Sequence, residues 1–243
     1  MHRIAFILGL LSLAVGAVGA SAGREPASDP FDPNLSPAER LEAVAERVRR
    51  AHESLETLEA EFSQVKESAL LVEPERATGQ FSFSAPDKVR WEYVTPEPIS
   101  LVIVDRKMTT WYRDIGQVET ARVGAQADRV LRYLGAGTSL DSLREYFQVA
   151  LQLSTAEGQP LKLKLSPRFE RVARRIREME LWLDPKLYLP VRLRYTEGDG
   201  DVTEYSFSGF RQNEGIPAGR FELEWPEGVD VREVLLDNRA GAR

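Results

Sequence analysis

The chain has 243 residues, a formal net charge of −6 and no cysteine. The lack of cysteine excludes disulfides, thiolate metal sites and cysteine nucleophiles. The acidic balance argues against nucleic acid, or an anionic membrane surface, as the main partner.

The first 22 residues have the pattern of a secretory signal peptide: a positive start at Arg3, an apolar run over 4–18 and the small residues Ala20-Ser21-Ala22. The apolar run is too short for a comfortable membrane span. We therefore expect cleavage after Ala22 and export of a chain of about 220 residues. An uncleaved N-terminal anchor is the alternative. Beyond the signal at 1–22 we expect a flexible leader at 23–35, one domain at 36–235 and a tail at 236–243.

A helix is predicted directly after the leader. Ser36 suits the N-cap, Pro37 the first helical position, and Glu39 can complete a capping box. Apolar residues then recur at helical spacing, which predicts a stripe that lies against a larger apolar surface. The stripe consists of Leu41, Val44, Ala45, Val48, Ala51, Leu55 and Leu58. His52, the one histidine beyond the first 22 residues, falls here among charged residues, where a solvated position is favoured over a catalytic base or a zinc ligand.

From Glu59 onward the apolar period changes to two, which predicts strands with one apolar and one solvated face. The alternating runs are 81–83, 89–93, 161–165, 179–183, 189–195, 205–207 and 221–225, and 99–104 is apolar on both faces. Gly198-Asp199-Gly200 predicts a hairpin between two of these runs. Adjacent antiparallel strands in such number predict one curved sheet with helices against its concave face.

The middle of the chain breaks this pattern. Residues 124–147 predict two short helices, with Leu131 and Leu134 on the first and Leu140 and Phe147 on the second. The sequence Gly135-Ala136-Gly137 separates them. Glycine gives the backbone freedom, so Gly135 and Gly137 are candidates for a hinge between the helices. The alternative is an ordinary loop in which glycine ends the first helix.

Short motifs follow one another along most of this chain in a recognisable order. They include Phe62-Ser63-Gln64, Gly79 with Phe81 and Phe83, Arg90-Trp91, Trp111-Tyr112, Leu165-Ser166-Pro167, Leu189-Pro190 and the closing pattern at 226–231. No single motif is specific, but their order and spacing together resemble the LolA family of periplasmic outer-membrane lipoprotein carriers.

The resemblance implies a mostly β fold with some α: an unclosed antiparallel half-barrel of about ten or eleven strands, with helices covering the concave face as a lid. It implies a periplasmic chaperone, not an enzyme, without cofactor or metal. Its expected partners are acylated lipoproteins, an inner-membrane releasing ABC transporter complex and an outer-membrane receptor, and we expect a monomer that does not bind nucleic acid. Two other functions stay open: a carrier of a phospholipid or glycolipid, and a lipid-sensing regulatory domain of the same fold.

The same resemblance implies that the apolar faces of the strands line an acyl-chain cavity. Those candidates are Phe81, Phe83, Trp91, Tyr93, Leu163, Leu193 and Phe207, and the lid candidates are Leu131, Leu134, Leu140 and Phe147. Ordinary core packing under the helices is the alternative for the strand residues. Where well-known members carry a lid-latching arginine, this chain has Ala85, so the nearby Arg90 is the candidate latch. Strand parity with Trp91 favours instead an Arg90 that points outward.

Five arginines fall between Arg168 and Arg177. They could form a docking patch for an acidic partner. Glutamates at 170, 178 and 180 lie close by in the sequence, and they favour a solvated hairpin.

Overall fold

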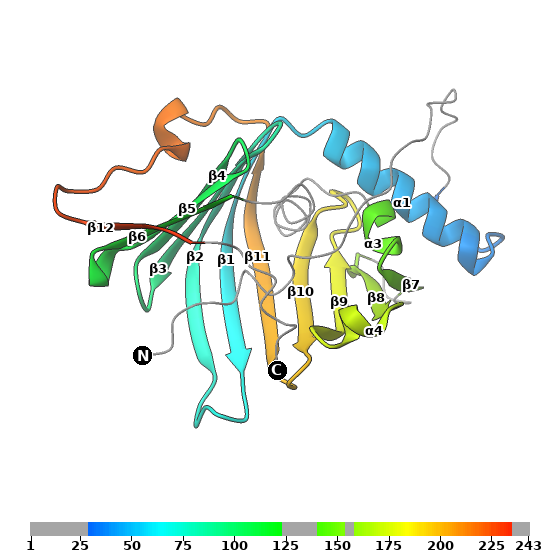
Figure 1. The fold of residues 1–243 in the computed structure, drawn as a ribbon. Helices are drawn as coiled ribbons and strands as arrows, with labels where there is room; N and C mark the ends of the chain where they lie inside the picture. Colours follow the sequence, from blue (N-terminus) through cyan, green and yellow to red (C-terminus); the bar gives the residue numbers. More distant parts are fainter. Residues whose placement is uncertain (1–28, 123–139, 154–157, 235–243) are drawn as a thin grey trace.

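The computed structural model describes residues 29–122, 140–153 and 158–234 (Figure 1). Twelve strands form a single sheet in the order β12-β6-β5-β4-β3-β2-β1-β11-β10-β9-β8-β7. Within the described residues the sheet does not close, because its edge strands, β12 and β7, pair only with β6 and β8. All neighbours are antiparallel except β12 and β6, which are parallel. The half-barrel fold expected from the sequence is thereby confirmed.

The strands are β1 (Thr57–Glu67), β2 (Glu75–Ser84), β3 (Lys88–Thr95), β4 (Ile99–Val104), β5 (Lys107–Tyr112), β6 (Gln117–Arg122), β7 (Phe147–Gln152), β8 (Leu161–Pro167), β9 (Ile176–Leu183), β10 (Pro190–Glu197), β11 (Val202–Gln212) and β12 (Asp230–Glu233). The helices are α1 (Pro37–Glu53), α3 (Leu140–Arg144) and α4 (Glu170–Ala173), with 3-10 turns η1 (Arg113–Ile115) and η2 (Ala218–Phe221).

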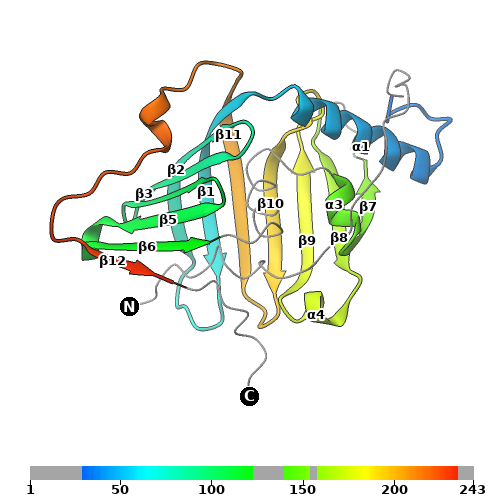
Figure 2. The ribbon, with the colours of Figure 1, turned by 45° about the horizontal axis from the view of Figure 1, so that its top comes forward.

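Helix α1 begins as the sequence predicts. The Ser36 hydroxyl accepts from the Glu39 backbone N–H at 3.3 Å, and the Glu39 carboxylate accepts from the Ser36 backbone N–H at 2.8 Å. The helix buries Ala43, Val44, Ala45 and Val48. Figure 2 shows α1 running across the ends of β7–β9, with α3 beside it. Both helices contact β7.

Strand register decides which side chains share a face. Phe81 lies opposite Trp91, which lies opposite Leu101. Across the other half of the sheet, Leu163 lies opposite Leu181, which lies opposite Leu193. These side chains project to the concave side, which we call the inner face, and they belong to one continuous buried core.

The outer face of β3 and β4 carries a second, smaller layer. Turn η2 lies against these strands, and Phe221 is buried there. The segment then continues to β12, whose Asp230 lies opposite Gln117 of β6. We call residues 213–234 the C-terminal strap; in Figure 1 they run from the end of β11 around the left half of the sheet.

Two local predictions are wrong. Residues 221–225, expected as a strand, form the end of η2 and extended chain, because Phe221 packs as a single anchor instead of alternating against a neighbouring strand. Phe147, expected on a helix, opens β7, where pairing with Pro167 fixes an extended backbone. The strands β7 and β12 account for the twelve observed against about ten or eleven expected.

Residues 1–28, 123–139, 154–157 and 235–243 lie outside the described part of the chain. They include the predicted signal peptide, most of the leader, the lid residues Leu131 and Leu134, and the hinge residues Gly135 and Gly137. Of the helices that the structure describes, none combines the length and the apolar character needed to cross a bilayer.

Candidate functional site

The seven side chains predicted for the cavity lie together on the inner face. Phe81 and Phe83 come from β2, Trp91 and Tyr93 from β3, and the rest from β8, β10 and β11. All seven are buried. The structure brings all seven to one apolar face, and their role as an acyl-chain cavity stays a prediction.

The centre of the inner face is aromatic. Phe62 of β1 lies edge-on to Trp91 with ring centroids 4.9 Å apart, and to Tyr93 at 5.0 Å. Trp91 also contacts Phe81 at 5.0 Å and Tyr205 at 5.8 Å, and Phe207 stacks on Tyr205 at 6.2 Å. Edge-to-face pairs of this kind add stabilisation beyond the area they bury. Because these rings come from β1, β2, β3 and β11, the cluster joins both halves of the sheet.

Gly79 makes room for this cluster. A Cβ atom at Gly79 would come within 2.6 Å of the Phe62 ring and 2.1 Å of the Glu92 carbonyl oxygen. Strand glycines often mark such close approaches. The sequence motif that contains Gly79 therefore has a packing role in this structure.

Sequence reasoning missed Phe62 and Tyr205 as members of the inner face. Phe62 was used only as part of a family motif, and Tyr205 only as part of an alternating run that predicts a strand. Their period-two spacing, with Gln64 after Phe62 and Phe207 after Tyr205, was the available signal. It could not reveal that β1 and β11 pair with each other, because partners such as Phe62 and Phe207 lie far apart in the chain.

Three tyrosine hydroxyls mark the end of the inner face farthest from α1. Burial raises the pKa of Tyr93, Tyr195 and Tyr205 far above its ordinary value. These groups therefore stay neutral even in alkaline solution where an exposed tyrosine would ionise. Beside them, Lys66 Nζ lies 3.2 Å from Asp201 Oδ2, which keeps that buried ammonium paired.

Helix α3 covers part of the half of the inner face that carries Leu163, Leu181 and Leu193. Leu140, a predicted lid residue, is buried on α3. Two ion pairs fasten α3 to α1: Arg49 to Asp141 at 3.0 Å and Arg144 to Glu42 at 2.9 Å. These pairs lie at the solvent-accessible surface, so each contributes at most about 1 kcal/mol. Phe147, the other described lid candidate, belongs to the sheet and not to the cover.

Arg90 lies on the outer face, opposite in parity to Trp91. Its guanidinium donates to Glu92 Oε2 at 2.6 Å and to the backbone carbonyl of Arg220 at 2.9 Å. Glu92 also accepts from Ser100 at 2.7 Å and pairs with Arg113 at 2.7 Å. Burial opposes the charged form of Glu92, but these hydrogen bonds prevail and lower its pKa. Arg90 therefore points outward and holds the C-terminal strap. We do not retain it as a candidate lid latch.

The arginines between Arg168 and Arg177 have local partners. Arg168 donates to the Phe147 carbonyl at 3.1 Å, and Arg174 pairs with Glu170 at 3.1 Å. Arg177 donates to the Gly198 carbonyl, and Arg171 lies 5.4 Å from the Phe169 ring centre. These contacts give the cluster a structural role around α4. Within the described residues, no group of three or more His, Asp or Glu side chains is arranged to hold a metal ion.

Comparison with known proteins gives consistent results. Residues 53–224 match the family model described as outer membrane lipoprotein carrier protein LolA. A protein named outer-membrane lipoprotein carrier protein from Chromobacterium violaceum is 30% identical over 177 residues, which cover 72% of this chain and 80% of that protein. One of the same name from Alkalilimnicola ehrlichii is 27% identical over 192 residues, covering 76% and 81%.

A solved structure resembles the fold at lower identity. It is an uncharacterized conserved protein from Thermus thermophilus, with a TM-score of 0.53 and 12% identity over 80% of this chain and 99% of that one. This likeness concerns the fold alone.

Proposed function

The chain belongs to the LolA family of outer membrane lipoprotein carrier proteins, and on that basis we propose that it carries acylated lipoproteins from the inner to the outer membrane. The observation that supports this most is the inner face itself: aromatic and aliphatic side chains from most strands, gathered on the concave side of an unclosed sheet. We assign it no catalytic step.

The energetics of the cargo suit such a face. Each exposed methylene costs about 0.8 kcal/mol, so one acyl chain of roughly 16 carbons costs on the order of 10 kcal/mol in water. The carrier must offer comparable apolar area and still release the chain. In the present structure the candidate cavity side chains are buried, so an acyl chain would have to displace other parts of the protein to contact them. Cover and cargo then compete, which lowers the apparent affinity for cargo.

The described part of the cover, helix α3, is held by surface ion pairs and by the buried side chains of Leu140 and Leu143. Helix α3 has five residues, and its ion pairs to α1 lie at the surface. The ion pairs contribute little, so the burial of Leu140 and Leu143 sets most of the free energy of displacing α3. The hinge at Gly135 and Gly137 and the lid residues Leu131 and Leu134 remain part of this proposal, to be tested by uptake rates after glycine-to-alanine replacement.

We place the protein in the periplasm, after removal of residues 1–22. The partners in this proposal are an inner-membrane releasing ABC transporter complex and an outer-membrane receptor. Intact-mass analysis of the exported protein tests the first point, since retention of Met1 would contradict cleavage.

A pair of photo-crosslinkers tests the function. A crosslinker at Trp91, on the inner face, should capture an acylated lipoprotein and fail to capture the same protein without its acyl groups. The matched control is Trp182 of β9, whose ring lies on the outer face between Lys162 and Arg192. Equal capture of unacylated protein at Trp91 would indicate a peptide-binding surface, and equal capture at Trp182 would indicate adhesion without a cavity.

A further inference from the structure

The inner face changes character along its strands. The inward series of β1 runs Leu58, Ala60, Phe62, Gln64, Lys66, and that of β11 runs Phe207, Tyr205, Thr203. Both series are apolar beside α1 and become polar toward the hairpin between β1 and β2. The face is therefore amphipathic along the strand direction, as an acyl chain with a polar end would require.

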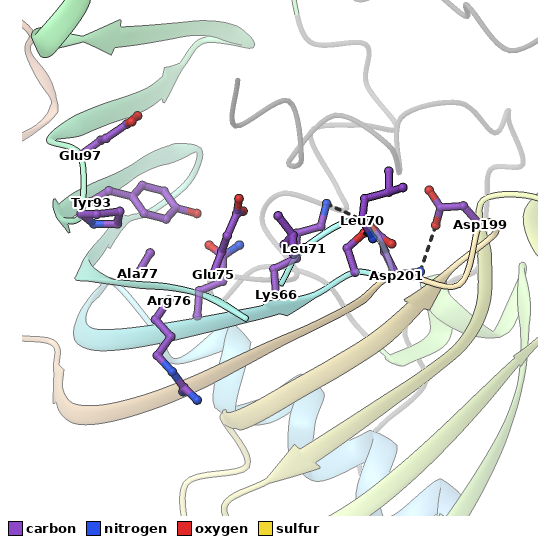
Figure 3. A pocket seen from close by; sticks show the side chains of 13 residues that line it. Lys66, Leu70, Leu71, Glu75, Arg76, Ala77, Tyr93, Glu97, Asp199 and Asp201 are labelled. Atoms are coloured by element: carbon purple, nitrogen blue, oxygen red, sulfur yellow. Dashed lines mark hydrogen bonds and ion pairs between the residues drawn. The ribbon is translucent and has the colours of Figure 1, made fainter. Parts of the chain in front are cut away.

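A pocket of about 520 Å³ lies at the polar end. It opens where the turns between β1 and β2, β3 and β4, and β10 and β11 converge, and Figure 3 shows Tyr93, Glu75, Lys66 and Asp199 around it. Leu70 and Leu71, from the β1–β2 turn, line its mouth. The volume is in the range of small-ligand sites. It is suited to a compact polar group with short stretches of hydrocarbon.

Gln64 gives this pocket an unsatisfied hydrogen-bonding group. The residue lines the pocket and is only 8% exposed. Its buried Oε1 atom accepts no hydrogen bond from any residue that the structure describes. A buried polar atom without a partner costs about 1–3 kcal/mol. The Oε1 atom is an acceptor, so an occupant that carries an N–H donor, such as an amide, could satisfy it.

The charges around the pocket disfavour anions. Lys66 is neutralised by Asp201. Glu75, Glu97 and Asp199 also line the pocket, and so does Arg76, whose side chain Figure 3 shows pointing away from it. The remaining charge is negative, and a phosphate in the pocket would meet like charges.

Building on the proposed function, we propose that this pocket is the subsite for the uncharged amide-and-ester linker of an acylated N-terminal cysteine. The linker carries an amide N–H, which complements Gln64 Oε1, and it carries no phosphate. The acyl chains then extend along the aromatic part of the face. The acidic lining selects this linker against the phosphate of a phospholipid with the same chains.

The first test is Gln64→Leu, with Gln148→Leu on the exposed side of β7 as the matched control. The probes are a triacylated Cys-Ser-Asn peptide amide with a blocked C-terminus and diphenylhexatriene, which has no polar linker. We expect Gln64→Leu to bind the lipopeptide about three- to tenfold more weakly, as loss of one hydrogen bond predicts. Binding of diphenylhexatriene should be unchanged, and Gln148→Leu should behave as wild type. Equal weakening for both probes would overturn the proposal, because it would indicate general damage to the face.

The second test neutralises the lining with Glu75→Gln, Glu97→Gln and Asp199→Asn together. Asparagine at 199 keeps a side-chain oxygen for the Asp201 backbone N–H, which donates to it at 3.1 Å. This variant should bind dipalmitoyl phosphatidylglycerol several-fold more tightly than wild type at about 50 mM salt, and the gain should shrink at about 500 mM. Unchanged phosphatidylglycerol binding would refute the charge selection.

Failure of this inference differs from failure of the proposed function. If wild type binds the lipopeptide and Gln64→Leu binds it equally well, the linker subsite is refuted while the carrier role stands. If wild type binds neither the lipopeptide nor diphenylhexatriene, the carrier role is refuted, and the subsite with it.

Discussion

The two faces of β3 carry opposite kinds of side chain. Trp91 and Tyr93 point inward and pack against other rings, whereas Arg90 and Glu92 point outward into a network of ion pairs beneath the C-terminal strap. Apolar packing is non-directional and can exchange one hydrocarbon surface for another. Charged hydrogen bonds depend on geometry and leave a costly buried group when one partner is lost. The outer face therefore fixes the sheet, whereas an inner face of this kind suits the exchange of contacts that the proposed function requires.

Removing the central ring should have the largest effect on stability. Trp91 is 2% exposed and touches four other rings, so Trp91→Ala should cost about 3–5 kcal/mol of unfolding free energy. The control is Trp225→Ala in the C-terminal strap, where the side chain is 37% exposed and the cost should stay below about 1 kcal/mol. Urea unfolding measures both. Similar losses in the two variants would contradict the central place of Trp91.

Alkaline pH should weaken the inner face selectively. The pKa of Tyr93, Tyr195 and Tyr205 is raised by burial in the folded state, so their contribution is full below the unfolded value of 10.0 and is lost as pH rises above it. At pH 11 each should remove about 1 kcal/mol of stability. Tyr195→Phe should reduce this slope. Absorbance titration should show these tyrosines ionising only on unfolding, and ionisation near pH 10 in the folded protein would refute their burial.

Breaking the outer network should have an intermediate effect. Glu92→Gln leaves Arg90 and Arg113 without their shared carboxylate, and we expect a loss of about 2 kcal/mol at pH 7. The matched control is Glu178→Gln, whose partner Lys164 is exposed, with an expected loss below about 1 kcal/mol. Denaturant unfolding measures both losses, as shifts of the midpoint at an unchanged m value. Equal losses would show that the outer network is no stronger than a surface pair.

Acid should then produce the smallest effect, part of it through Glu92 on the outer face. The pKa of Glu92 is lowered in the folded state, so its contribution is present above the ordinary value of 4.5 and is lost as pH falls through the folded pKa. Wild type should lose stability in this window more steeply than Glu92→Gln. Parallel curves for the two proteins between pH 6 and 3 would contradict the assignment.

The local features of this protein follow from its sequence alone. Residue spacing predicts the capping box at Ser36 and Glu39 and the turn at Gly198–Gly200. It also predicts the inward side of β2, β3, β8 and β10, because helix and strand periods are properties of the backbone.

Which strands pair with each other is decided only when the chain folds. Folding placed Phe62 against Trp91 and Tyr205, turned Phe147 into a strand residue, and laid the C-terminal strap over Arg90. It also joined Gln64, Tyr93 and Asp201 around one pocket. These arrangements depend on contacts between residues far apart in the chain, and local periodicity does not predict such contacts.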